Sequence, residues 1–204
     1  MEQKYFQKLL RQDSFLTPQE VKKLLKAIDR RYFLGVRDYA VIKTFLSCGL
    51  RKSELQNLRV EHYQKAPGYA WMIVKGKGGQ ELDQVFNSKT TIAAIDKYLK
   101  MSGHGNDGNA PLFQSIGKHK VSNGLILCRI SIDYMLKKYA RKAGMSKNIH
   151  CHMLRHTFGT EIYKATKDVI TTQFAMRHKD GGSTLIYLHS DKDRILEGLK
   201  QAGI

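Results

Sequence analysis

The sequence predicts a mostly α (α+β) fold, in which helices surround one small antiparallel sheet. Three observations support this fold class. Helix signals recur along most of the 204 residues, strand character is concentrated between Tyr69 and Phe86, and 42% of the residues are hydrophobic, which is enough for a core. The chain has no internal repeat, no low-complexity tract and no clear domain boundary, so we expect residues 1–204 to form a single domain.

The clearest helix boundaries lie in the N-terminal half. Thr17-Pro18-Gln19-Glu20 reads as a capping box with proline at the first helical position, which predicts a helix start at residue 18. Gly49 is typical of a helix C-terminus, and a further helix follows at once, so we expect a tight backbone break beside Arg51. The expected helices cover residues 18–29, 37–47, 53–58, 88–101 with Ser88 as the cap, 129–143, 153–164, 168–176 and 191–201.

One stretch has the character of a β-hairpin. Tyr69–Lys75 is rich in aromatic and β-branched residues, and Gly76-Lys77-Gly78-Gly79 turns it back into residues 80–86. Lys77 is therefore expected at the tip of the hairpin. Residues 102–111, SGHGNDGNAP, read as a glycine-rich connection.

The charge of the chain narrows its function. Lysine and arginine total 35 against 18 acidic residues, giving a formal charge of +17 and a pI near 9.8. A basic globular chain most often binds nucleic acid, because neutralising phosphates releases condensed counterions; a membrane surface is the weaker alternative. The apolar stretch 40–50 is short and interrupted by Lys43, so no membrane span is expected.

The compartment is expected to be the cytoplasm, with association with the nucleoid when the protein is bound to DNA. The N-terminus MEQKYFQKLLRQ is charged throughout and lacks an apolar segment and a cleavage site for export. Cys48, Cys128 and Cys151 are odd in number and have no CxxC spacing, which favours reduced thiols.

Reactive side chains gather towards the C-terminus. His152 and Arg155 are three residues apart, so they share a helix face, and Arg177-His178 is followed nine residues later by Tyr187. Each has an ordinary alternative. A lone tyrosine such as Tyr187 is usually a plain core or surface aromatic, and zinc binding by His152 and His156 lacks both the usual glutamate and a third ligand.

The upstream cations have ordinary alternatives too. Arg51 can form a surface ion pair with Glu54 at spacing i,i+3, and a lysine at a hairpin tip is usually polar turn filler. No single residue decides the function.

The order and spacing of these residues resemble the tyrosine recombinase (phage integrase) family along nearly the whole chain. The resemblance implies that family's DNA breaking-rejoining fold, a catalytic domain, and an active site of Arg51, Lys77, His152, Arg155, His178 and Tyr187, with Glu54 in a supporting role. The motifs that carry it are Cys48-Gly49-Leu50-Arg51-Lys52-Ser53-Glu54-Leu55, Val74-Lys75-Gly76-Lys77-Gly78, His152-Met153-Leu154-Arg155-His156-Thr157-Phe158-Gly159-Thr160, Arg177-His178 and Thr184-Leu185-Ile186-Tyr187.

The chain departs from the family pattern around these motifs. Cys48 stands where threonine is usual, Leu82 and Phe86 stand where a basic residue and a proline often follow the hairpin turn, Arg177 replaces the common leucine-glycine before the histidine, and Gly181-Gly182 follows. Lys75 is the alternative to Lys77 as the lysine that reaches phosphate. Lys77 is preferred because glycines flank it and let the backbone approach DNA.

The residue types suit transesterification at phosphorus. Arg51 and Arg155 offer planar forks of donors that match phosphate oxygens, and His178 can donate a further hydrogen bond. Tyr187 is the expected nucleophile, His152 its proton acceptor and Lys77 the general acid for the leaving oxygen. The product is a covalent 3′-phosphotyrosine. No metal and no cofactor are expected.

The resemblance also implies binding partners and indicates which domain of the family this chain contains. The partners are double-stranded DNA with specific recombination sites and three further copies of the chain, in a homotetramer that exchanges strands through a Holliday junction. Residues 191–204 dock either on a neighbouring protomer or on their own domain. The N-terminal core-binding domain of most relatives is expected to be absent, as in an excised fragment or a naturally short recombinase. The rival readings are a type IB topoisomerase-like relaxase, a catalytically inactive DNA-binding regulator of the same fold and, with least support, a zinc-dependent nuclease.

Overall fold

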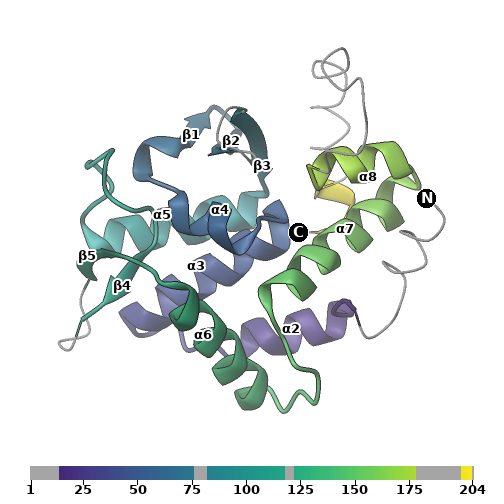
Figure 1. Ribbon diagram of the computed structural model, residues 1–204, viewed down its shortest axis with the longest axis horizontal. Helices are drawn as coiled ribbons and strands as arrows, with labels where there is room; N and C mark the ends of the chain where they lie inside the picture. The colour runs from purple at the N-terminus through teal and green to yellow at the C-terminus, as the bar shows by residue number, and fades with distance from the viewer. Residues whose placement is uncertain (1–13, 76–81, 118–121, 178–198, 204) are drawn as a thin grey trace.

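The computed structural model describes residues 14–75, 82–117, 122–177 and 199–203 (Figure 1). Within these ranges more residues lie in helices than in strands, as predicted. The strands pair in antiparallel orientation. The elements are α2 (Pro18–Lys26), α3 (Phe33–Cys48), α4 (Lys52–Asn57), the 3-10 turn η1 (Val60–His62), β1 (Tyr63–Ala66), β2 (Tyr69–Lys75), β3 (Leu82–Asn87), α5 (Lys89–Ser102), β4 (Gln114–Ile116), β5 (Ser122–Ile126), α6 (Arg129–Lys142), α7 (Cys151–Thr166) and α8 (Val169–Ala175).

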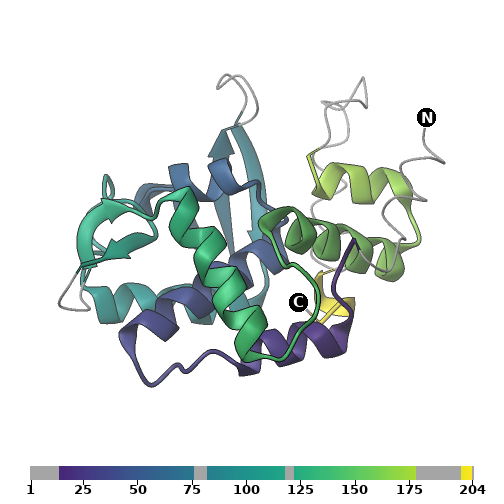
Figure 2. The ribbon, with the colours of Figure 1, turned by 60° about the horizontal axis from the view of Figure 1, so that its bottom comes forward.

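The predicted hairpin is confirmed as β2 and β3, which pair from Ala70 with Asn87 to Lys75 with Leu82. It rises out of the helical part of the molecule in Figure 2. A third strand, β1, joins β2 on its other side, and the expectation of a single sheet is wrong, because β4 and β5 form a second, two-stranded ladder. In β2 the buried Ala70, Met72 and Val74 alternate with more exposed residues, so one face of the larger sheet packs on the core.

Helix α3 runs through the centre of the molecule and packs against α5 on one side and α7 on the other (Figure 1). Two of its buried charged side chains, Arg37 and Asp38, satisfy each other. Arg37 and Asp38 form an ion pair with a nitrogen–oxygen distance of 2.6 Å, and the Tyr139 hydroxyl donates to Asp38 at 2.8 Å. Burying a charge costs little only when it is paired in this way.

The ends of α2 and α3 differ from the predicted bounds. The Thr17 capping box is present, with Thr17 Oγ1 accepting from the Glu20 amide, but α2 ends at Lys26 rather than near residue 29. Helix α3 begins at Phe33, four residues before the expected start. Gly35 explains this start, because a Cβ there would lie 1.9 Å from the Asp29 carbonyl oxygen, so glycine allows the chain to turn into α3 beside that carbonyl.

The helices that follow are near their predicted places. The Ser88 cap is confirmed, and α5 and α6 match their expected ranges within about one residue. Helix α7 begins at Cys151, two residues early, because the His150 side chain accepts the Met153 amide as an N-cap at 3.2 Å. Most of the expected helix 191–201 lies outside the described residues. Its last part, residues 199–201, is described and is helical.

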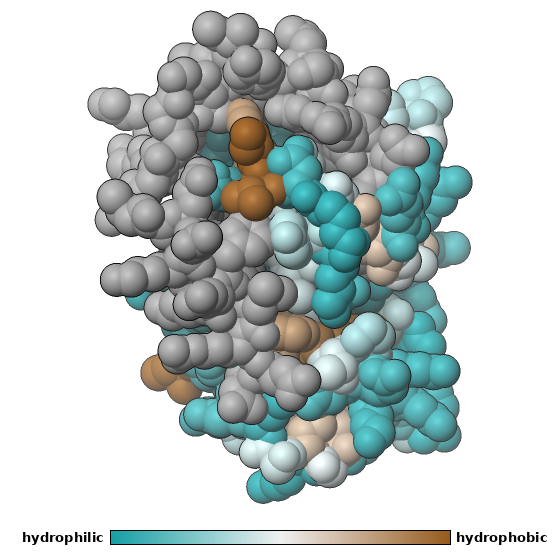
Figure 3. Space-filling view, turned by 90° about the vertical axis from the view of Figure 1, so that its right-hand side faces the viewer, coloured by the Kyte–Doolittle hydropathy of each residue, from teal (hydrophilic) through white to brown (hydrophobic). Residues whose placement is uncertain are grey.

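The face shown in Figure 3 is mainly hydrophilic where its residues are coloured, with a compact hydrophobic patch. Among the described helices none has the length and apolar character needed to cross a membrane.

Candidate active site

The site is organised around the break between α3 and α4. Gly49 ends α3 in the left-handed conformation, with φ 55° and ψ 32°, as the sequence predicted. A Cβ at Gly49 would lie 2.3 Å from the ring of Phe158 on α7. Glycine is therefore needed both for its backbone conformation and for the close approach of α7.

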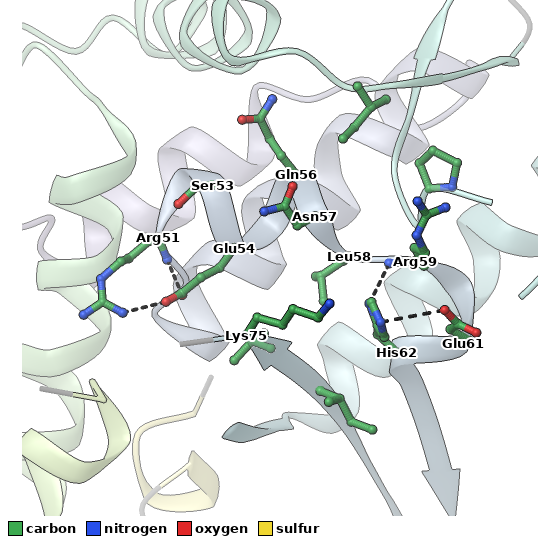
Figure 4. Close-up of a pocket in the computed structure, with 14 residues that line it drawn as sticks. Arg51, Ser53, Glu54, Gln56, Asn57, Leu58, Arg59, Glu61, His62 and Lys75 are labelled. Atoms are coloured by element: carbon green, nitrogen blue, oxygen red, sulfur yellow. Dashed lines mark hydrogen bonds and ion pairs between the residues drawn. The ribbon is translucent and has the colours of Figure 1, made fainter. Parts of the chain in front are cut away.

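Arg51 follows this break as the N-cap residue of α4 and has an extended backbone. Its Nη1 donates to Glu54 Oε1 at 2.6 Å, and its amide donates to Glu54 Oε2 at 2.7 Å (Figure 4). Its Nη2 donates to the Arg177 carbonyl at 3.2 Å. The Arg51 side chain remains 38% exposed, so one carboxylate orients it while part of it faces solvent.

Arg155 comes to the same place from α7 and is buried. Its Nη1 donates to the Gly49 carbonyl at 2.5 Å, across 106 residues of sequence, and its Nη2 donates to the Met176 carbonyl. The fork of Arg155 thus joins the end of α3 to the turn after α8. Arg51 and Arg155, which the sequence pairs as phosphate ligands, bond to the adjacent carbonyls of residues 177 and 176.

Arg177 is a member of this cluster that sequence reasoning did not include. Its Nη2 pairs with Glu54 Oε2 at 2.6 Å, and Nη1 donates to the Cys48 carbonyl at 3.3 Å. Its Nε lies 3.9 Å from Asp83 on β3. Among the described residues, two guanidinium groups therefore meet around the Glu54 carboxylate, and Arg155 bonds to the neighbouring backbone of Gly49 and Met176. The cluster of three arginines and one carboxylate keeps an excess of positive charge.

The Glu54 carboxyl is ionised in this setting. Burial raises its pKa, but Arg177 and then Arg51, through charge and hydrogen bonds, outweigh burial and hold the pKa below its usual value. The carboxylate therefore stays charged at neutral pH and can fix both guanidinium groups.

His152 lies in the first turn of α7 and is exposed, in contrast to the buried Arg155. Its ring centroid is 4.2 Å from that of His156, with the rings at 78° to each other, and 6.5 Å from that of His150. His152 thus lies at the exposed start of the helix that carries Arg155, among two further imidazoles.

Three predicted residues, Lys77, His178 and Tyr187, lie outside the described residues. Lys75, the alternative lysine, is the last residue of β2. It lines a cavity of about 670 Å³ that Arg51 also lines. In Figure 4 the Lys75 side chain crosses this cavity with its amine directed away from Arg51, towards Leu58 and His62.

Comparison with known proteins identifies the family. The model of the phage integrase family matches residues 14–194, which is most of the chain. The chain belongs to the phage integrase family.

Curated relatives in this family include tyrosine recombinases XerC. The protein of Caldanaerobacter subterraneus subsp. tengcongensis is 32% identical over 94% of the chain, and that of Oceanobacillus iheyensis is 32% identical over 90%. The chain spans 52% and 59% of the lengths of these two relatives.

Solved structures give the same assignment. A XerH site-specific recombinase, described as a post-cleavage complex bound to palindromic difH substrate, is 26% identical with a TM-score of 0.69, over 92% of this chain and 52% of that one. The XerA recombinase is 24% identical with a TM-score of 0.66, over 92% and 64%, which supports the fold. The mostly helical fold with a small antiparallel sheet is thus the fold of this family.

One departure from the phage integrase pattern, Cys48, has a structural explanation. Cys48, in the place of the usual threonine, donates from Sγ to Asn87 Oδ1 at 3.0 Å, so the thiol still provides a hydrogen bond between α3 and the end of β3. Burial raises the pKa of this thiol to about 11, so it stays protonated. Cys48, Cys128 and Cys151 are free cysteines in the structure.

The contribution of Arg177 was missed although its sequence carried a signal. It stands where the family has a small, conformationally permissive residue, and its φ is 52°. An arginine in the place where the family has glycine before the histidine can be recognised from the sequence alone. Its contact with Glu54, across 123 residues, is tertiary and is not encoded in any local pattern.

In the described part of the chain, potential metal ligands are scattered rather than clustered. Within residues that the structure describes, no group of three or more histidine, cysteine, aspartate or glutamate side chains could hold a metal ion.

Proposed function

We propose that the chain is the catalytic domain of a site-specific DNA recombinase or integrase, which cleaves and rejoins DNA through a covalent 3′-phosphotyrosine intermediate. The observation that carries the proposal is the convergence of Arg51 and Arg155. Both guanidinium groups bond to the turn Met176–Arg177, and Arg155 also bonds to Gly49, two residues before Arg51. Family membership and the strongly basic charge support the same conclusion.

In this proposal Arg51 and Arg155 bind the non-bridging oxygens of the scissile phosphate. Negative charge grows on these oxygens in the pentacoordinate transition state, and guanidinium groups that are already fixed stabilise it without reorganisation. Glu54 keeps Arg51 oriented. Removing one such donor typically lowers the rate on the order of 100-fold to 1000-fold.

The remaining steps are proton transfers around a nucleophilic attack. The Tyr187 oxygen attacks phosphorus and its proton passes to His152, while the bond from phosphorus to the 5′-oxygen breaks and Lys77 protonates the leaving oxygen. His178 donates a hydrogen bond to the phosphate. The phosphotyrosine bond conserves the energy of the diester, so a DNA 5′-hydroxyl can reverse the step without ATP or a metal ion.

The proposed partners are double-stranded DNA with specific recombination sites and three further copies of the chain. The XerH relative was crystallised with its difH substrate, which supports duplex DNA as the ligand. Strand exchange between two duplexes through a Holliday junction requires four nucleophiles, and hence a tetramer on DNA.

Covalent capture tests the proposed nucleophile. Nicked duplexes that carry candidate recombination sites are incubated with the wild-type chain in EDTA, and protein–DNA adducts are resolved on a denaturing gel. We expect an adduct from the wild type and none from Tyr187→Phe, which loses only the hydroxyl and keeps DNA binding. Tyr32→Phe is the matched control, because Tyr32 is 67% exposed at the start of α3, and it should form the adduct normally.

The alternatives predict other results. An adduct that persists in Tyr187→Phe contradicts the nucleophile, and an adduct that EDTA abolishes favours a metal nuclease. DNA binding without any adduct favours an inactive regulator. Relaxation of supercoiled DNA without exchange between sites favours a type IB topoisomerase-like relaxase.

A further inference from the structure

The geometry points to Arg177 as a positioning residue, which neutralises Glu54 and so leaves Arg51 free to receive a phosphate. The inference deepens the proposed function and rests on it. Arg177 contacts Glu54 through its side chain and Arg51 through its own carbonyl, so one residue holds both members of the pair.

The backbone of Arg177 indicates that this contact is selected rather than incidental. Its φ of 52° lies in the left-handed region, which is disfavoured for residues with a side chain and which glycine adopts readily. The long side chain is nonetheless only 8% exposed, and it reaches the carbonyls of Cys48 and Gly49 as well as Glu54. The contacts made by the guanidinium group offset the unfavourable backbone conformation.

The charges explain what Arg177 contributes. Each oxygen of Glu54 takes a different guanidinium group, with Arg51 on Oε1 and Arg177 on Oε2, both at 2.6 Å. Without Arg177, Arg51 alone would compensate this buried carboxylate, and the attraction of the site for an anion would fall. With Arg177 present, the positive charge of Arg51 remains available.

Exposure separates the roles of the two arginines. The Arg51 side chain is 38% exposed, whereas that of Arg177 is 8% exposed. Arg51 is the more accessible of these two, and the Nη1 and Nη2 atoms of Arg177 donate to protein oxygens of Cys48, Gly49 and Glu54. Arg177 acts through Glu54 and the backbone of the α3–α4 break.

A double-mutant cycle between Arg177 and Glu54 tests this role without DNA cleavage. The variants are Arg177→Gln, Glu54→Gln and the double variant, with Arg177→Lys as the conservative change. Arg177→Gly is added because glycine suits the backbone and should fold even if glutamine does not. Arg31→Gln is the matched control, since it removes an arginine from an exposed pair with Asp29.

Two quantities are measured on the whole chain: the pKa of Glu54 from carbon NMR of its carboxyl group, and the affinity for inorganic phosphate. The pKa of Glu54 should rise in Arg177→Gln and Arg177→Gly, because burial is then opposed by Arg51 alone, and should stay low in Arg177→Lys and Arg31→Gln. Phosphate affinity should fall about fivefold to tenfold in Arg177→Gln and recover in the double variant.

Contrary results are equally clear. An unchanged Glu54 pKa in both Arg177→Gln and Arg177→Gly overturns the inference. A double variant that binds phosphate as weakly as Arg177→Gln overturns it too, because Arg177 would then contact phosphate itself. If wild-type protein formed no covalent adduct with any DNA, the proposed function would fail, while the pKa and phosphate measurements would still decide the role of Arg177.

Discussion

Gly49 is the residue on which the two halves of the candidate site meet. Its carbonyl accepts from Arg155 and, at 3.5 Å, from Arg177, and its missing side chain leaves room for the Phe158 ring. A residue with a Cβ would meet two separate penalties, one from its left-handed backbone and one from the ring.

We expect Gly49→Ala to lower the free energy of unfolding by about 2–5 kcal/mol, from a left-handed backbone term of about 1–2 kcal/mol and an overpacking term of about 1–3 kcal/mol. Gly103→Ala is the control: Gly103 ends α5 with φ 74°, and a Cβ added there would meet nothing within 4 Å. Gly103→Ala should lower the free energy of unfolding by the backbone term alone, about 1–2 kcal/mol. Urea denaturation measures both, and equal losses would show that the Phe158 contact is unimportant.

At the scale of elements, the start of α2 is joined by hydrogen bonds to α7 and to the segment before α7. The Leu16 amide, just before α2, donates to Thr157 Oγ1 at 2.9 Å, and Lys147 donates to Glu20 at 2.9 Å. The capping box at Thr17 therefore lies where α2 meets the helix that carries His152 and Arg155.

Replacing Thr17 by alanine should destabilise the protein by about 1 kcal/mol, because the Glu20 amide loses its side-chain acceptor. Thr17→Ser keeps a hydroxyl at the same place and should cost only a small fraction of that amount. Thermal unfolding of both variants beside the wild type gives the comparison. A loss of similar size in Thr17→Ser would mean that the methyl group, and not the cap, provides the stability.

The helix ends that were predicted well are those set by local chemistry. Thr17, Ser88 and Gly49 act through hydrogen bonds or backbone preferences within a few residues, and such signals can be read from sequence alone. The order of the family motifs similarly led to Arg51, Glu54 and Arg155, and the structure brings these three together.

The elements that were missed depend on distant partners. Strands β4 and β5 are short, and their pairing is irregular. Strands this short carry no clear alternation of apolar and polar residues that would predict them. Strand β1 is only four residues long and is defined by its pairing with β2. Arg177 belongs with them, because its function in the cluster arises from contacts with residues more than a hundred positions away.

For the whole molecule, the net charge of +17 is the property with the broadest consequence. The proposed binding to duplex DNA should be dominated by phosphate contacts and therefore be steeply dependent on salt. These contacts give affinity and orientation, whereas the preference for a site comes from the base edges and from the shape of the DNA.

If about 6–10 phosphates are contacted, affinity for duplex DNA should fall by about 10³-fold to 10⁵-fold between about 50 and 200 mM salt. The logarithm of the binding constant is plotted against that of the salt concentration for the wild type and Arg51→Gln. The variant should lose about one unit of slope, the contribution of one phosphate contact. A wild-type slope near zero would contradict an electrostatic interface.

The guanidinium contacts also have a consequence for protein synthesis. Arg51 leaves the ribosome more than a hundred residues before Arg155 and the turn Met176–Arg177, the groups that complete its surroundings. A growing chain, or a product of premature termination before Cys151, therefore carries one half of a phosphate site without the other. The order of translation thus delays the assembly of the proposed phosphate site until the turn Met176–Arg177 has been made.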